Sequence, residues 1–242
     1  MTNPTPVALI VGAGDAIGSA IARRFAQEGL TVCAARRNVE RLDGLIADIK
    51  ADGGNAHAFA LDARKEDQVT ALFAQIEQDI GELEVVVFNV GANVPMTMVN
   101  TPSKKFFKIW EMACFAGFLT GREAAKVMQP RKRGTIIFTG ATASTRGAAG
   151  FGAFASAKHG LRAIAQSLAR EMGPNNIHVA HAVIDAPVDT AWIRENFPNV
   201  DKLPEDGLVN PASIAEHYVF IHNQPRDAWT FEFDLRPWVE RW

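Results

Sequence analysis

Short apolar runs alternate with longer stretches of helical periodicity along the 242 residues of the chain. The run VALIV, beginning at Val7, is apolar at every position, which is typical of a strand buried on both faces of a parallel sheet. The intervening stretches repeat apolar residues three and four positions apart, as one face of a helix does. Strands are predicted at 7–14, 31–36, 56–62, 83–91, 134–140, 177–184 and 229–235, and helices at 17–29, 39–54, 66–81, 103–128, 152–173 and 211–223.

The alternation predicts an α/β fold with a parallel sheet covered by helices on both faces. The sequence shows no linker, repeat or low-complexity segment, so we expect one domain over residues 1–242. In such sheets, ligands bind at the carboxyl ends of the strands. Residues that directly follow the strands are therefore the candidates for function.

Composition narrows the class of protein. A formal net charge of −2 gives no overall field to attract nucleic acid or an anionic membrane. Cys33 and Cys114 are far apart in sequence and lack metal-ligand spacing, so we expect no disulfide framework and no metal site. The first residues do not form a charged segment followed by a long apolar run, and no run is long enough to span a membrane. We expect a soluble, cytoplasmic protein.

A glycine-rich turn follows the first predicted strand. The segment VGAGDAIG places Gly12, Gly14 and Gly18 between that strand and the first predicted helix. Small residues there allow the backbone to turn tightly and bring helix N-terminal amides onto a pyrophosphate. The alternative is a tight turn that binds nothing.

This loop, the segment FNVGA after the fourth strand and the motif FASAK together resemble the short-chain dehydrogenase/reductase family. The resemblance runs in order from about residue 7 to residue 235. It implies a Rossmann-type, doubly wound sheet of about seven strands in the order 3-2-1-4-5-6-7, which binds a nicotinamide dinucleotide. The family's loop has glycine where this chain has Ala16, and the added methyl group would lie close to the pyrophosphate.

The resemblance assigns further cofactor positions. Asp62 matches the aspartate that accepts a hydrogen bond from the adenine amino group, although an aspartate at a strand end can also be a simple cap. The positions implied are Gly12, Gly14, Asp15, Ile17 and Gly18 in the loop, Asp62 and Ala63 for adenine, Asn89 and Gly91 for the ribose, and Val188 and Thr190 near the nicotinamide.

The end of the second strand favours NADP(H) over NAD(H). An acidic residue there would hold the 2′-hydroxyl of NAD, but the chain has Arg36 and Arg37, which suit a 2′-phosphate. Asp15 points the other way, because NADP-preferring relatives often have a basic residue at that position.

The catalytic positions depart from the family's pattern. Lys158 is retained, but Phe154 stands at the position of the tyrosine, Ala141 at that of the serine and Cys114 at that of the asparagine. A shift in the match would make Thr142 or Ser144 the polarising hydroxyl instead. Lys158 has a second role in the family, which is to bond the nicotinamide ribose. The alternative interpretation is a partly exposed helix lysine.

Other groups could supply a proton only from less favourable positions. The sole tyrosine, Tyr218, is predicted in a late helix away from the nicotinamide. His159 is expected to point away from the pocket, and His181 to lie in the core. Asp185 replaces the family's proline after the sixth strand, where it is either a new polar group or, as we favour, a cap for a backbone turn.

The last third of the chain suggests a lid and an interface. The lid region at 190–210 contains Trp192, Ile193 and Phe197, which favour an apolar ligand. The tail at 229–242 contains three of the five tryptophans, Trp229, Trp238 and Trp242, and we expect it to pack against a neighbouring subunit. The resemblance also implies a homodimer or homotetramer formed by the helices at 103–128 and 152–173.

Two functional hypotheses follow. The chain is either an oxidoreductase on a carbonyl or alcohol with weakened proton transfer, or a non-catalytic dinucleotide-binding protein that acts as a sensor, scaffold or partner subunit. The identity of the substrate cannot be read from the sequence.

Overall fold

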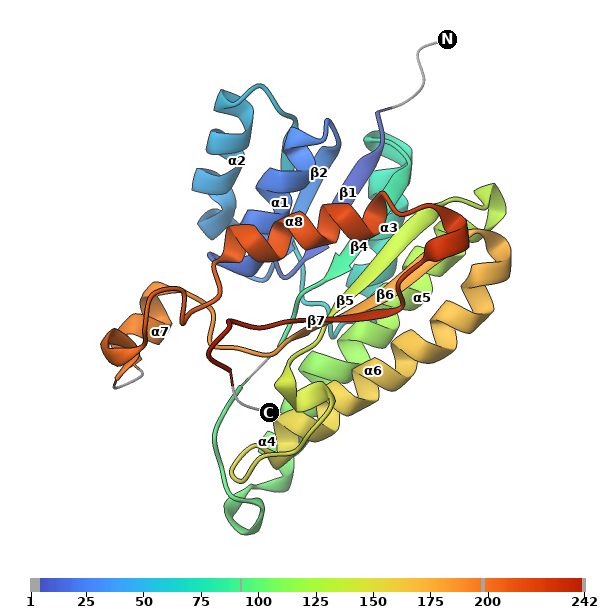
Figure 1. The fold of residues 1–242 in the computed structure, drawn as a ribbon. Helices are drawn as coiled ribbons and strands as arrows, with labels where there is room; N and C mark the ends of the chain where they lie inside the picture. Colours follow the sequence, from blue (N-terminus) through green and yellow to red (C-terminus); the bar gives the residue numbers. More distant parts are fainter. Residues whose placement is uncertain (1–4, 92, 197–198, 241–242) are drawn as a thin grey trace.

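The computed structural model describes residues 5–91, 93–196 and 199–240. Its seven strands form one parallel sheet in the order β3-β2-β1-β4-β5-β6-β7, with helices on both faces (Figure 1). The predicted fold class and strand order are therefore confirmed. Two residues discussed above, Phe197 and Trp242, lie outside the described residues.

Alternate residues of the central strands contribute to two different cores. In β1 (Val7–Val11), Ala8 and Ile10 pack against the helices on one face of the sheet, whereas Val7, Leu9 and Val11 pack against those on the other face. All five residues are buried, which explains why this strand is apolar at every position. The remaining strands are β2 (Thr31–Arg36), β3 (Ala56–Ala60), β4 (Leu83–Phe88), β5 (Gly134–Thr139), β6 (Ile177–Ile184) and β7 (Glu232–Leu235).

The α-helices match the predicted segments apart from their ends, except that α7 lies in the region predicted as a lid and the segment at 103–128 is divided. They are α1 (Ile17–Gln27), α2 (Asp43–Ala51), α3 (Glu66–Asp79), α4 (Ser103–Trp110), α5 (Ala116–Met128), α6 (Gly152–Met172), α7 (Ala191–Asn196) and α8 (Pro211–His222). No helix in the described part of the chain is long and apolar enough to cross a membrane.

The single helix predicted at 103–128 is interrupted. A π-helical segment, Glu111–Phe115, separates α4 from α5. Such bulges occur frequently at functional sites, because the extra residue in the turn redirects side chains. Here the segment includes Cys114, one of the predicted site positions.

Candidate functional site

The glycine loop between β1 and α1 is packed tightly against the end of β4. Gly12 has φ of +88°, and a Cβ at this position would lie 2.6 Å from the carbonyl oxygen of Asn89. The Asn89 side-chain amide donates a hydrogen bond to the Gly12 carbonyl at 3.0 Å. A Cβ on Gly18 would lie only 2.4 Å from that same carbonyl. Glycine at positions 12 and 18 therefore lets α1 begin close to the carboxyl end of β1, with the amides of Ile17 and Gly18 at its N-terminus.

A cavity of about 590 Å³ lies beside this loop, where β1, β2, β3 and β4 end. The residues of the sequence prediction that line it are Gly12, Gly14, Arg36, Arg37, Asp62, Ala63, Asn89 and Gly91. The structure adds Asn38, Arg41, Arg64, Met112 and Ala116, which the sequence analysis did not identify. A Cβ on Gly14 would meet no heavy atom nearer than 4.0 Å, so this side of the loop is open.

The cationic side of the cavity is formed by arginines at the end of β2 and in the segment after it. Arg36 donates to Asp15, with Nη1 2.7 Å from Oδ1, and Arg41 lies 3.4 Å from the other carboxylate oxygen. Both arginines also line the cavity, whereas Asp15 does not. The loop carboxylate thus holds two of the arginines that would face a phosphate.

At the end of β3, Asp62 is paired with an arginine two residues further along the chain. Arg64 donates from Nε and Nη2 to the two Asp62 oxygens, at 2.8 and 2.5 Å. These hydrogen bonds keep the pKa of the Asp62 carboxyl below its usual range. The backbone N–H of Arg64 also donates to Asp62, at 3.2 Å, so the residue caps the turn as well.

Lys158 is almost fully buried on α6. Its ammonium donates to the carbonyls of Thr139 at 2.7 Å and Val90 at 3.2 Å, which lie at the ends of β5 and β4. The nitrogen lies 5.8 Å from the centre of the Phe154 ring. Burial lowers the pKa of Lys158 to about 8, because the charged form is desolvated. The alternative interpretation, a partly exposed helix lysine, is wrong, because Lys158 is only 4% exposed.

The other three predicted catalytic positions come together beside Lys158. Cys114 and Phe154 are buried in one apolar cluster, and Ala141 is partly buried against it. A Cβ on Gly91 would contact both Lys158 and the Phe154 ring, at 3.5 and 3.6 Å. The four predicted catalytic positions therefore lie together, next to Gly91, which lines the cavity.

The hydroxyls near this site are hydrogen-bonded to other groups of the protein. Thr142 donates to Asp185 at 2.5 Å, and Ser144 is fully buried and accepts a hydrogen bond from the Ala141 amide at 3.1 Å. Tyr218 is fully buried against the other face of the sheet and is bonded to the Thr139 hydroxyl at 2.8 Å.

Asp185 does not cap a backbone turn, so the favoured prediction for it was wrong. Its buried carboxylate accepts hydrogen bonds from the side chains of Thr142 and Arg146, the latter at 3.2 Å. Arg236 lies 3.8 Å from its second oxygen. The carboxylate therefore joins the loop after β5 to the segment after β7, an interaction between distant segments that turn preferences cannot predict.

The two histidines considered as proton donors, His159 and His181, lie where the sequence predicts. His159 is exposed and bonds the carbonyl of Ala155 on its own helix. His181 is fully buried, with Nδ1 2.9 Å from Glu232. Burial lowers the pKa of its imidazole to about 4.

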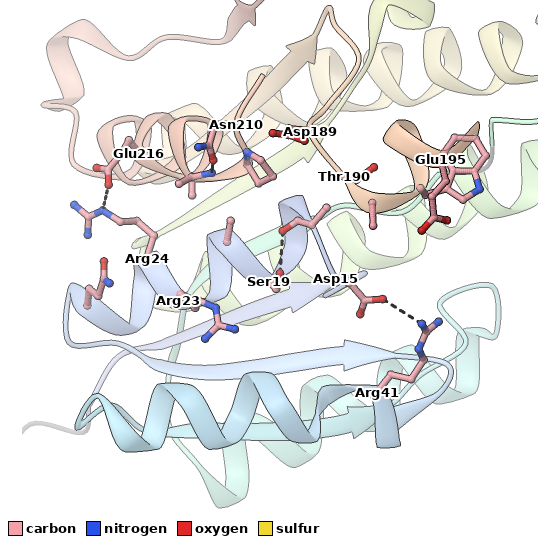
Figure 2. Close-up of a pocket in the computed structure, with 18 residues that line it drawn as sticks. Asp15, Ser19, Arg23, Arg24, Arg41, Asp189, Thr190, Glu195, Asn210 and Glu216 are labelled. Carbon is pink, nitrogen blue, oxygen red and sulfur yellow. Dashed lines mark hydrogen bonds and ion pairs between the residues drawn. The ribbon is translucent and has the colours of Figure 1, made fainter. Parts of the chain in front are cut away.

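A second and larger cavity, of about 990 Å³, lies between α1, α7 and the start of α8 (Figure 2). Asp15 and Thr190 line it, and the ion pair between Asp15 and Arg41 is at its edge. Thr190 accepts a hydrogen bond from the Ile193 amide at 3.0 Å, which starts α7, and Val188 pairs with Val209. Trp192 is exposed on α7, and the first turn of α1 carries Ile17 and Gly18.

Comparison with known proteins identifies the family. A family model described as short chain dehydrogenase matches residues 6–201. The chain belongs to the short-chain dehydrogenase family. A solved short-chain dehydrogenase from Rhodopseudomonas palustris is 49% identical, covering 97% of this chain and 99% of its own, with a TM-score of 0.83.

Two further proteins are less similar to this chain in sequence. A 3beta-hydroxysteroid dehydrogenase from Mediterraneibacter gnavus is 31% identical over 185 residues, which are 76% of this chain and 66% of that protein. A metagenomic short-chain oxidoreductase solved in complex with NADP is 24% identical and shares the fold, with a TM-score of 0.84 over 99% of this chain and 100% of its own.

The cavity fits the nicotinamide dinucleotide that short-chain dehydrogenases bind. Its open glycine face can receive a pyrophosphate, and the arginines after β2 supply positive charge. The apolar residues Val11, Ala35 and Ala63 also line the cavity. No cluster of three or more His, Cys, Asp or Glu side chains suited to a metal occurs among the residues described.

Proposed function

We propose that this short-chain dehydrogenase binds NADP(H) and that its tyrosine-dependent proton transfer is lost or slow. The observation that carries the proposal is the apolar cluster around Lys158. Phe154, Ala141 and Cys114 gather there, and none of these side chains has a hydroxyl or amide group. The bound cofactor would supply the hydride to a carbonyl carbon or take it from an alcohol.

The preference for NADP(H) is supported by charge. Arg36, Arg37 and Arg41 line the cavity where the second strand ends, and no acidic residue occupies that strand end. Guanidinium groups can bind a 2′-phosphate through paired hydrogen bonds. The partial neutralisation of Arg36 by Asp15 weakens this preference without removing it.

The role that we propose for Lys158 is cofactor binding. Two of its three N–H donors are used by the carbonyls of Val90 and Thr139, which fix the ammonium beside Gly91. The third remains for a ribose hydroxyl. With Phe154 in place of tyrosine, the ammonium has no phenol to activate.

A non-catalytic dinucleotide-binding protein is the second candidate. One observation supports this candidate. In the loop after β5, the Thr142 hydroxyl is hydrogen-bonded to Asp185 and the Ser144 hydroxyl to the backbone of Ala141. Such a protein would report or transmit cofactor binding rather than turn over a substrate.

We also propose self-association. A shallow groove of about 460 Å³ between α5 and α6 is lined by Phe118, Ile164 and Leu168, and Phe118 is exposed. Trp229, in contrast, stacks on His178 of its own chain at a centroid distance of 4.8 Å, while Trp238 is exposed. Light scattering of the purified chain tests this proposal directly, since a monomer would contradict it.

Equilibrium titration tests cofactor binding. NADPH and NADH would be titrated separately while energy transfer from tryptophan to the reduced nicotinamide is followed. The proposal predicts that NADPH binds more tightly than NADH and that Arg36→Ala reduces this difference. Equal or NAD-favouring affinities would contradict the NADP preference, and failure of both to bind would contradict the function.

A further inference from the structure

The cavity assigned to the cofactor contains an arginine to which the family's motif gives no role. Arg64 lies in the turn between β3 and α3, lines the cavity and has a side chain that is 19% exposed. Its guanidinium is held at the end of β3, beside the residue that the resemblance assigns to adenine.

Two acidic residues fix the plane of this guanidinium. Asp62 accepts from Nε and Nη2, which is the paired geometry that locks an arginine in orientation. A Glu111 carboxylate oxygen lies 3.6 Å from the remaining nitrogen, Nη1. Glu111 begins the π-helical segment, and Met112 of that segment lines the same cavity. Arg64 thus connects the β3 end with the interrupted helix.

The hydrogen bonds from Arg64 also occupy most of the acceptor positions of the Asp62 carboxylate. A carboxylate offers about four acceptor positions. Arg64 takes three of them, with its backbone N–H and Nε on Oδ1 and Nη2 on Oδ2. The position left on Oδ2 is the one available for the adenine amino group. Recognition of that amino group by Asp62 is therefore weakened before any ligand arrives.

We propose that Arg64 is an adenine-binding residue, whose guanidinium plane stacks on the base while Asp62 and Glu111 act as its positioning residues. This inference rests on the proposed function. A guanidinium plane stacks on a nucleobase through its face and makes no use of the 6-amino group. The site consequently accepts a dinucleotide in which that group is absent.

Two ligands separate stacking from amino-group recognition. They are NADPH and its hypoxanthine analogue, in which an oxo group replaces the 6-amino group, each titrated against the full chain by tryptophan fluorescence. The wild type is expected to bind them with affinities within about threefold of each other. Arg64→Leu is expected to weaken both by about tenfold, the lower part of the range for loss of one stacking contact. It also frees Asp62, so a preference for the adenine ligand should emerge.

Two further variants make the result specific. Arg64→Lys keeps the charge without the plane, so it is expected to bind as weakly as Arg64→Leu. Lys65→Leu removes an exposed neighbouring charge that does not line the cavity, and it should bind like the wild type. Far-ultraviolet circular dichroism tests whether each variant is folded. If Arg64→Leu or Arg64→Lys is not folded, Arg64→Gln takes its place.

The outcomes distinguish this inference from the proposed function. The inference is overturned if the wild type binds NADPH at least tenfold more tightly than the hypoxanthine analogue and Arg64→Leu leaves that ratio unchanged. That result would support the family's role for Asp62. An Arg64→Lys variant with wild-type affinity would overturn stacking. In both cases NADPH still binds, so the proposed function stands. Failure of the folded wild type to bind either ligand overturns both.

Discussion

The ammonium of Lys158 lies 5.8 Å from the centre of the Phe154 ring, one helical turn away on α6. The charge faces an aromatic ring rather than a hydroxyl. Its hydrogen bonds to Val90 and Thr139 anchor it to the ends of β4 and β5. This arrangement keeps a cation next to Gly91, which lines the cavity, but no phenol stands beside that cation.

Cofactor affinity should therefore depend on pH through Lys158. Burial lowers its pKa from about 10.5 to about 8, so the ammonium is present below pH 8 and is lost above it. The affinity for NADPH should fall by about tenfold between pH 7 and pH 9.5, the size of one hydrogen bond to a charged group. Fluorescence titrations across this range measure the effect. Lys158→Met should bind weakly at every pH, and a parallel decline in that variant would assign the effect to another group.

Asp15 should limit the selectivity for NADPH. Its carboxylate holds Arg36 and Arg41 and would lie near the 2′-phosphate. Asp15→Asn removes the negative charge with little change in shape, so NADPH should bind about threefold to tenfold more tightly, while NADH changes little. Paired titrations at low and high salt measure this selectivity. An equal gain for both cofactors would indicate a change in the loop rather than at the phosphate.

His181 should contribute to loss of stability in acid. Its pKa is about 4 in the folded chain and about 6.5 when unfolded, because burial disfavours the imidazolium. Between these values the unfolded state binds more protons, so the free energy of unfolding falls as the pH is lowered from 6.5 to 4. His181→Asn should show a shallower decline in urea unfolding across this range. Identical slopes would assign the decline to other groups.

Stability should depend on glycine at position 140, because the ring of His181 leaves no room there for a side chain. A Cβ at this position would lie 2.4 Å from Nε2 of that ring and 2.8 Å from the Ser144 hydroxyl. Gly140→Ala should reduce the free energy of unfolding by about 1–3 kcal/mol through overpacking. Gly147→Ala is the matched control, since its Cβ would meet nothing nearer than 4.0 Å, and it should change stability by less than about 0.5 kcal/mol. Equal effects would show that the steric account is wrong.

The sequence predicted the sheet well because burial on both faces leaves a strong signal. Strands such as β6 (Ile177–Ile184) are apolar or buried throughout, and the predicted bounds of that strand match the structure. The glycine loop was equally readable, since Gly12 and Gly18 are positions where a side chain would collide with the backbone. Local spacing also placed Lys158 and Phe154 on one face of a helix.

Side-chain pairing could not be predicted in the same way. The contacts between Asp15 and Arg36, and between Thr142 and Asp185, join residues that lie far apart in sequence. The pair formed by Asp62 and Arg64 is local, and an arginine two residues after the aspartate was a usable signal. The break in the helix at Glu111–Phe115 has no proline or glycine to announce it.

The central claim is that the cavity binds NADP(H) while the apolar cluster around Lys158 lacks a proton donor. The most direct measurement compares NADPH oxidation by the wild type and by Phe154→Tyr combined with Ala141→Ser, over a panel of aliphatic and aromatic ketones and aldehydes. The account predicts that both proteins bind NADPH and that the double variant oxidises it at least about 10²-fold faster with one or more of these compounds, the lower range for positioned acid–base catalysis. Brisk oxidation by the wild type, with no gain in the double variant, would contradict it.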